Sequence, residues 1–237
     1  MSSVDAPRPF RPPRFQLVPK PGGGERRLTV LDPLEDATYR RVVGRLAGML
    51  ERVLGPEVTA HRVASTVPLT LRPWRGERRE FERRRLALVE GYNVVVKTDV
   101  RECYPSMRPD VVERAFVGLG PRRDDALRLR RILEGFAAGG VDGVPIGPVA
   151  SAVVANAVLA AVDRAIRSAS APHLRWVDDV WATCRDERHA AEVLHRIRES
   201  LDAIGLSVNE AKTRVMDRAD AFALLAVARG GDSGCPE

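Results

Sequence analysis

Cysteine is scarce in this chain of 237 residues, and long apolar runs are missing. The cysteines Cys103, Cys184 and Cys235 lie far apart without a C-x-x-C pair, so the sequence indicates neither a disulfide framework nor a zinc site. A reducing cytoplasm is the expected location. The N-terminus lacks the apolar segment of a secretory signal, and the apolar run at 148–162 is too short and too rich in small and polar residues to span a membrane. We expect this run to form a buried helix, and we expect no membrane partner.

Lysine is also scarce, since it occurs only at positions 20, 97 and 212, and arginine supplies the other 35 of the 38 basic residues. The net charge of +6 suits a polyanionic partner, nucleic acid above all. A general bias towards arginine on solvated helices gives the same charge, so both interpretations stay open at this point. The length and the 44% hydrophobic content suffice to bury a core in one large domain or two lobes.

The N-terminal part of the chain is predicted to hold an extended arm, a hairpin and two helices. Residues 1–14, rich in proline and arginine, form the arm. The β-like runs on either side of PKPGGGER indicate a hairpin. Asp32 as N-cap and Pro33 in the first turn begin a helix that should run to about Leu54. The mixed charges at 78–90 predict a solvated helix, with a nucleic-acid contact as the alternative.

From residue 93 onwards, predicted strands and helices alternate. NVVVKTDV, residues 93–100, is a β-branched run typical of a buried strand, and helical patterns follow at 122–138, 148–167 and 187–204. HLRWV and VWATC are predicted to form a hairpin, and LSVNEAKTRVM is predicted to return as a strand. This order favours an α+β fold in which helices back an antiparallel sheet, of the β-α-β-β-α-β type.

Three aspartates are expected to meet in such a fold. Asp178 and Asp179 lie at the turn of the predicted hairpin, and Asp99 ends the strand expected beside it. Carboxylates that converge repel one another and stay ionised only with cations between them, and hard oxygen ligands favour Mg²⁺. Two such ions about 3.5–4 Å apart serve phosphoryl transfer in polymerases. The alternative is that Asp178 and Asp179 are turn residues of a surface hairpin, although their neighbours are apolar.

Five motifs, in the same order, resemble the reverse transcriptases, in particular the bacterial group that includes group II intron and retron enzymes. WVDD is similar to the Y-x-D-D box of that family, and VVVKTDVRECYPSM to the motif that precedes it. GVPIGPVASAVVANAVLAAVDRAI resembles the G-x-P-Q-G motif with its S-x-x-x-A-N helix, and GLSVNEAKT the G-L-x-x-N-x-x-K-T segment. PKPGGGERRLTVLDPLED is similar to the basic hairpin and helix of the fingers. The resemblance covers residues 17–216.

The resemblance implies a polymerase palm with a fingers subdomain. The implied division is an extended arm at 1–14, fingers at 15–92 and 107–145, palm at 93–106 and 146–228, and a disordered tail at 229–237. AFALLAV is interpreted as a remnant of the strand after the palm, and the few residues behind it leave no room for a thumb. We therefore expect weak binding of primer and template, a partner protein that supplies a thumb or clamp, or a copy that does not polymerise.

The resemblance also implies the catalytic residues. Asp99 and Asp178 would be the metal-bridging carboxylates, with Asp179 assisting. Lys212 would protonate the pyrophosphate leaving group, whereas the alternative makes it a surface lysine. The implied cofactor is two Mg²⁺ ions, with Mn²⁺ as a substitute.

Six further residues are implied to bind the nucleotide: Lys20, Arg26, Arg27, Tyr104, Ile146 and Gly147. The three basic residues would reach the triphosphate from the tip of the hairpin, or else they are solvated turn residues. Tyr104 would be the steric gate against a ribose 2′-hydroxyl, or else an ordinary half-buried aromatic. Ile146 stands where the family usually has Gln, so the handling of the nascent base pair is expected to differ.

The implied activity is that of an RNA-directed DNA polymerase, which adds dNTPs to the 3′-hydroxyl of a DNA or RNA primer on an RNA template. One alternative is a template-independent or protein-primed polymerase, as in antiviral defence. Another is a nucleic-acid-binding relative whose catalysis is impaired. The retained aspartates favour catalysis, and the missing thumb favours its loss.

Overall fold

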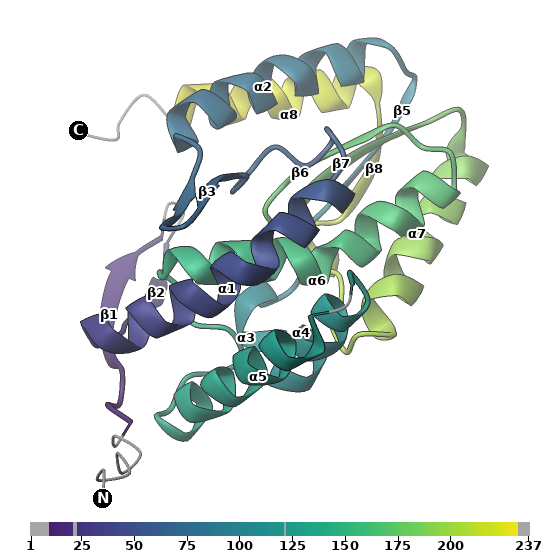
Figure 1. Ribbon diagram of the computed structural model, residues 1–237. Helices are drawn as coiled ribbons and strands as arrows, with labels where there is room; N and C mark the ends of the chain where they lie inside the picture. Colours follow the sequence, from purple (N-terminus) through teal and green to yellow (C-terminus); the bar gives the residue numbers. More distant parts are fainter. Residues whose placement is uncertain (1–9, 21–22, 121, 232–237) are drawn as a thin grey trace, which may run out of the picture.

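The computed structural model describes residues 10–20, 23–120 and 122–231, and its centre is a four-stranded antiparallel sheet (Figure 1). The strands are β5 (Val94–Thr98), β6 (His173–Trp176), β7 (Asp179–Cys184) and β8 (Arg214–Asp217), in the order β6-β7-β5-β8. The β-branched run of β5 therefore occupies an inner position, paired with β7 on one side and with β8 on the other. The predicted α+β class and the antiparallel sheet are confirmed.

One face of the sheet packs on α6 (Val149–Ser168) and α7 (Glu187–Asp202), and with them forms the main core. The small side chains of α6 allow close packing, and most of the helix is buried. By length and composition α6 is long and apolar enough to cross a membrane, and most of its apolar window is buried inside the protein, as in a core helix. The expected buried helix is confirmed, and it extends beyond the apolar run at 148–162.

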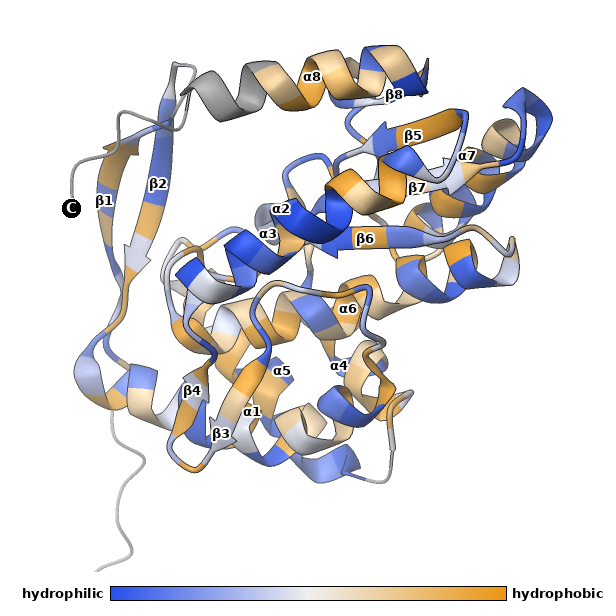
Figure 2. Cartoon of the chain, turned by 90° about the horizontal axis from the view of Figure 1, so that it is seen from above, coloured by the Kyte–Doolittle hydropathy of each residue, from blue (hydrophilic) through white to orange (hydrophobic). Residues whose placement is uncertain are grey.

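The other face of the sheet is covered by α2 (Trp74–Glu90) and α8 (Arg218–Gly231), which lie side by side above it in Figure 1. A second, smaller core forms between these layers and includes Phe81, Val95 and Trp181. Figure 2 shows α2 as largely hydrophilic, in agreement with the predicted charged helix, which begins at Trp74 rather than at residue 78. The interpretation of AFALLAV as a strand is wrong, because this segment lies in α8 and places Ala221 and Leu225 in the second core.

The remaining helices gather beside α6. They are α1 (Pro33–Val53), the short α3 (Cys103–Ser106), α4 (Pro109–Val117) and α5 (Arg123–Ala138). The predicted start of α1 is confirmed, because the side chain of Asp32 accepts a hydrogen bond from the backbone N–H of Leu34, and Pro33 occupies the first helical position. Two hairpins complete the fold: β1 (Arg14–Pro19) with β2 (Glu25–Val30), and β3 (Val63–Thr66) with β4 (Leu69–Leu71).

Two details differ from the expected pattern. The segment 206–216 is not one strand, because a short 3-10 helix, η1 (Glu210–Lys212), interrupts it before β8. Residues 229–231, expected in a disordered tail, belong to α8, and residues 232–237 lie outside the described residues. Most of the expected arm, residues 1–9, lies outside them as well.

Candidate active site

The site forms where the end of β5 meets the hairpin of β6 and β7. Thr98 lies opposite Val180 in the antiparallel ladder, so the next residue of the first strand, Asp99, comes beside the hairpin turn. Asp99 is almost buried, with 8% of its surface exposed. Two segments that are far apart in the sequence are thereby held together by backbone hydrogen bonds.

The hairpin turn is tight and strained. Trp176 pairs with Asp179, which leaves only Val177 and Asp178 in the turn. Val177 has a φ of +58°, a left-handed conformation that is unusual for a β-branched residue. Such strain persists only where the surroundings hold it, and it is common at functional sites.

Asp178 shares its environment with Asp99 and with α3. Burial and the negative charge of Asp99 raise the pKa of Asp178 from 3.8 to about 6. Burial raises the pKa of Cys103 and of Tyr104, and the charge of Asp178 raises both further. The structure therefore brings Asp99, Asp178 and Tyr104 to one place.

Lys212 also reaches this place. Its Nζ lies 3.1 Å from Oδ2 of Asp99, and Nδ2 of Asn209 donates a hydrogen bond of 3.3 Å to Oδ1 of the same carboxylate. The backbone N–H of Asn209 donates to the carbonyl of Asp99 at 2.7 Å, which fixes the approach of η1 to the strand end. A lysine with more than half of its side chain exposed is thus anchored beside the buried carboxylate.

Asp179 begins β7, and its carboxylate is held by Lys97 and Trp181. Successive side chains of a strand alternate between faces, and Asp179 has the same parity as Trp181, which belongs to the second core. Its Oδ1 lies 2.9 Å from Nζ of Lys97, and its Oδ2 accepts a hydrogen bond of 3.0 Å from Nε1 of Trp181. Asp179 is thus engaged by Lys97 and Trp181, while its charge also raises the pKa of Asp178, so its expected part in a cluster with Asp99 and Asp178 stays a prediction.

The remaining donors can be compared with what a divalent cation needs. In the described part of the chain, no group of three or more His, Cys, Asp or Glu side chains is arranged to hold a metal ion. Mg²⁺ commonly binds through only one or two carboxylates and completes its coordination with waters and substrate phosphates. A cation would also relieve the repulsion between Asp99 and Asp178, so this pair fits such an ion.

The nucleotide-binding residues expected on the first hairpin face in different directions. In β2, Arg27 shares its face with Thr29, whose backbone N–H donates a 2.7 Å hydrogen bond to the carbonyl of Ile146. Nη2 of Arg27 donates to the carbonyl of Gly140 at 3.1 Å, on the same side. Arg26 lies on the opposite face of the hairpin, and Lys20 is exposed beyond the end of β1. Arg27 is therefore the arginine whose side chain contacts the loop before Ile146, where its Nη1 also lies 3.8 Å from Oδ2 of Asp142.

Tyr104 and the loop at 143–147 are fitted to each other. The backbone N–H of Val144 donates to the carbonyl of Tyr104 at 2.9 Å. Gly143 has a φ of +61°, and an added Cβ would collide with the carbonyl oxygens of Tyr104 and Pro105. Gly147, with a φ of +123°, lies against Thr29, so this loop joins Tyr104 to the first hairpin.

Two residues of the site were not singled out from the sequence: Asn209 and Arg175. Asn209 lies within a quoted motif, and its spacing from Lys212 was the available signal, whereas Lys97 stood out as one of only three lysines. Arg175 precedes the aromatic of the WVDD box, and in a chain with 35 arginines nothing distinguished it. Its side chain is completely buried and bonded to the hairpin turn.

The raised pKa of Asp178 predicts that the free energy of unfolding depends on pH. The unfolded chain ionises this group near its ordinary pKa of 3.8, and the folded chain only near 6. The cost of ionisation therefore develops as the pH rises through this window and is fully present above it. At pH 7.5 we expect the free energy of unfolding of Asp178→Asn to exceed that of the wild type by about 2 kcal/mol, so that the variant unfolds at a higher urea concentration. At pH 4 we expect this advantage to be lost.

The matched control is Asp179→Asn, which removes the ion pair with Lys97 and relieves only the weaker of the two repulsions that act on Asp178. This variant should be less stable than wild type at pH 7.5. A gain in stability of Asp178→Asn that is the same at both pH values would contradict a raised pKa of Asp178 in the folded protein.

Comparison with known proteins agrees with this geometry. Residues 18–228 match the family described as reverse transcriptase (RNA-dependent DNA polymerase). No curated protein sequence matches the chain.

Solved telomerase structures have a similar fold. The telomerase of Candida albicans in complex with the TWJ fragment of telomeric RNA has a TM-score of 0.55 and 16% identity, over 85% of this chain and 41% of that one. The equivalent complex from Candida tropicalis has a TM-score of 0.59 and 15% identity, over 86% and 41%. The chain thus spans less than half the length of these telomerases, and the likeness concerns the fold. Since the family match covers most of its length, the chain belongs to the reverse transcriptase family.

Proposed function

We propose that the chain catalyses RNA-directed DNA synthesis, in which a dNTP is joined to the 3′-hydroxyl of a primer on an RNA template. The observation that carries this proposal is the meeting of Asp99 and Asp178 beside Lys212 and Tyr104. A chain that had kept only the fold would have no need to hold two mutually repelling carboxylates at one place. Membership of the family supports the same activity, as does the resemblance of the motifs to those of group II intron and retron enzymes.

The residues of the site divide the work as follows. Asp99 and Asp178 would hold Mg²⁺, which supplies Lewis-acid activation of the primer hydroxyl and stabilisation of the pyrophosphate oxygens. Lys212, anchored on Asp99, is placed to donate a proton to the leaving group. Arg27 contacts the loop before Ile146 and can bind the triphosphate through its two-pronged guanidinium, while Lys20 would assist from the hairpin tip. Asp179 balances the charge of Lys97 and would assist Asp178, on which its own charge acts.

The partners and the setting follow from the same proposal. The proposed partners are an RNA template, a DNA or RNA primer and dNTPs, in agreement with the net charge of +6. A protein that supplies a clamp is a further proposed partner, and the cysteine usage supports a cytoplasmic location.

Removal of either metal-binding carboxylate should abolish synthesis. We expect Asp99→Asn and Asp178→Asn each to lower the incorporation of dTTP on poly(rA)/oligo(dT) with Mg²⁺ by about 1,000-fold, since metal assistance is worth several kcal/mol. Gel-resolved primer extension measures this. No incorporation by the wild type at any metal or enzyme concentration would refute the proposal. Extension without poly(rA) would indicate template-independent synthesis instead.

The two neighbouring arginines of β2 should differ in their effect on the nucleotide. Arg27→Ala is expected to raise KM for dTTP by about 10-fold, because a charge-assisted hydrogen bond is lost. Arg26→Ala, on the opposite face, should raise it clearly less. Steady-state incorporation across a range of dTTP concentrations checks this, and equal effects of both variants would contradict the assignment of Arg27.

Tyr104 should control the choice of sugar. Tyr104→Ala is expected to increase the incorporation of UTP relative to dTTP by about 10-fold or more, because it removes the ring that would collide with a 2′-hydroxyl. Tyr104→Phe keeps the ring and should keep the discrimination of the wild type. An unchanged ratio of the two efficiencies in Tyr104→Ala would show that Tyr104 only fills space.

A further inference from the structure

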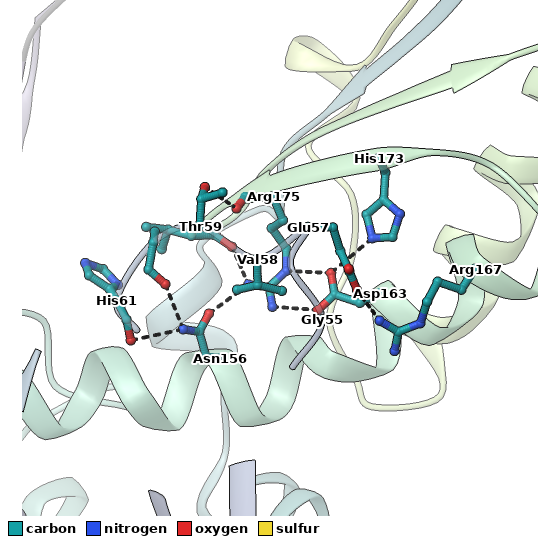
Figure 3. A network of polar contacts seen from close by, with 12 residues as sticks. Gly55, Glu57, Val58, Thr59, His61, Asn156, Asp163, Arg167, His173 and Arg175 are labelled. Carbon is teal, nitrogen blue, oxygen red and sulfur yellow. Dashed lines mark hydrogen bonds and ion pairs between the residues drawn. The ribbon is translucent and has the colours of Figure 1, made fainter. Parts of the chain in front are cut away.

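Arg175 is completely buried, with 0% of its surface exposed, in β6 next to the catalytic hairpin turn. Arginine is rarely buried, because its charge must be fully paired to leave water. Figure 3 shows its side chain between the hairpin and α6, at the centre of a network of polar contacts. This network includes none of the residues proposed to bind metal or nucleotide.

The guanidinium of Arg175 makes two kinds of bond. Nε and Nη2 donate to the two carboxylate oxygens of Asp163 at 2.8 and 2.7 Å, which neutralises the charge. Nη1 donates to Oδ1 of Asn156 at 3.0 Å and to the carbonyl of Val177 at 2.8 Å. The first pair of bonds accounts for the burial of the charge, and the bond to Val177 reaches into the strained turn that carries Asp178.

The same residues tie the turn to a segment outside the sheet. The backbone N–H of Arg175 donates to the carbonyl of Glu57 at 2.9 Å, and the backbone N–H of Thr59 donates to the carbonyl of Arg175 at 3.2 Å. Nδ2 of Asn156 donates to the carbonyl of Ala60 at 2.9 Å. The segment 57–61 therefore covers the free edge of β6 and is joined to the turn through one buried side chain.

We propose that Arg175 is a positioning residue that fixes the turn of Val177 and Asp178, and thereby the metal-binding geometry of Asp178. The inference rests on the proposed function. It adds that α6 and the segment 57–61 support the turn that carries Asp178. A left-handed valine would relax without a bond to its carbonyl, and the Asp178 carboxyl would move with it. Arginine suits this position because its planar fork makes four bonds at once, two to Asp163, one to Asn156 and one to the turn, whereas a lysine ammonium has only three donors.

The test is Arg175→Lys in the full chain, because lysine keeps a positive charge for Asp163 and loses the fixed fork. Mn²⁺ is the probe, and its binding to the protein alone is measured by the electron paramagnetic resonance signal of the free ion. We expect Arg175→Lys to bind Mn²⁺ about 10-fold more weakly than wild type, as is usual when the support of a metal ligand is lost. In primer extension kcat should fall by a similar factor, while KM for the primer and template stays within about twofold.

Arg167→Lys is the matched control. Arg167 also joins α6 to the covering segment, through an ion pair with Glu57, but its guanidinium does not contribute to the bonds at the turn. This variant should bind Mn²⁺ and turn over as the wild type does. Thermal unfolding of both variants separates loss of folding from loss of positioning.

A second variant, Asn156→Ala, keeps the ion pair of Arg175 with Asp163 and removes the second acceptor of Nη1. It should weaken Mn²⁺ binding in the same direction by about threefold, a smaller loss than that of a complete supporting group. If a folded Arg175→Lys, or Asn156→Ala where Arg175→Lys does not fold, binds Mn²⁺ and turns over like wild type, the inference is overturned and the proposed function stands. A wild type that neither binds Mn²⁺ nor extends a primer overturns both.

Discussion

The antiparallel pairing of β5 with β7 is the constraint on which the site depends. It brings Asp99 beside Asp178 although the two are far apart in the chain, and it holds them there against their mutual repulsion. The sheet can bear this cost because both of its faces are buried, one on α6 and α7 and the other on α2 and α8. A divalent cation would remove the repulsion, so the structure is most strained in the state that is ready to bind one.

Neighbouring charged residues have different partners in this fold. Asp178 lies beside Asp99 and Tyr104, whereas Asp179 forms an ion pair with Lys97. Arg26 and Arg27 differ in the same way, and Arg27 is the one that contacts the loop before Ile146. Adjacent residues of like charge in β2 thus have different surroundings, because successive side chains of a strand alternate between its faces.

The sequence predicts the helices and strands of this fold better than it predicts which of their side chains contact one another. The β-branched run of β5, the cap at Asp32 and the amphipathic pattern of α7 are local signals, and each element appears where it was expected. The prediction of a strand at AFALLAV failed, because a short apolar run fits a strand or a buried helix until its packing is known. Arg175 could not be recognised because its burial depends on Asp163 and Asn156, which come from a helix earlier in the chain.

The strained turn and the buried arginine belong to one physical problem. A hairpin with two turn residues gives Asp178 a single position, but it forces Val177 into a left-handed conformation. The bond from Arg175 to the carbonyl of Val177 opposes relaxation of that turn. The ion pair with Asp163 compensates the desolvation cost of the buried guanidinium. By the proposal above, the position of the Asp178 carboxylate is set by α6 and the segment 57–61, so that this segment and the site can influence each other without direct contact.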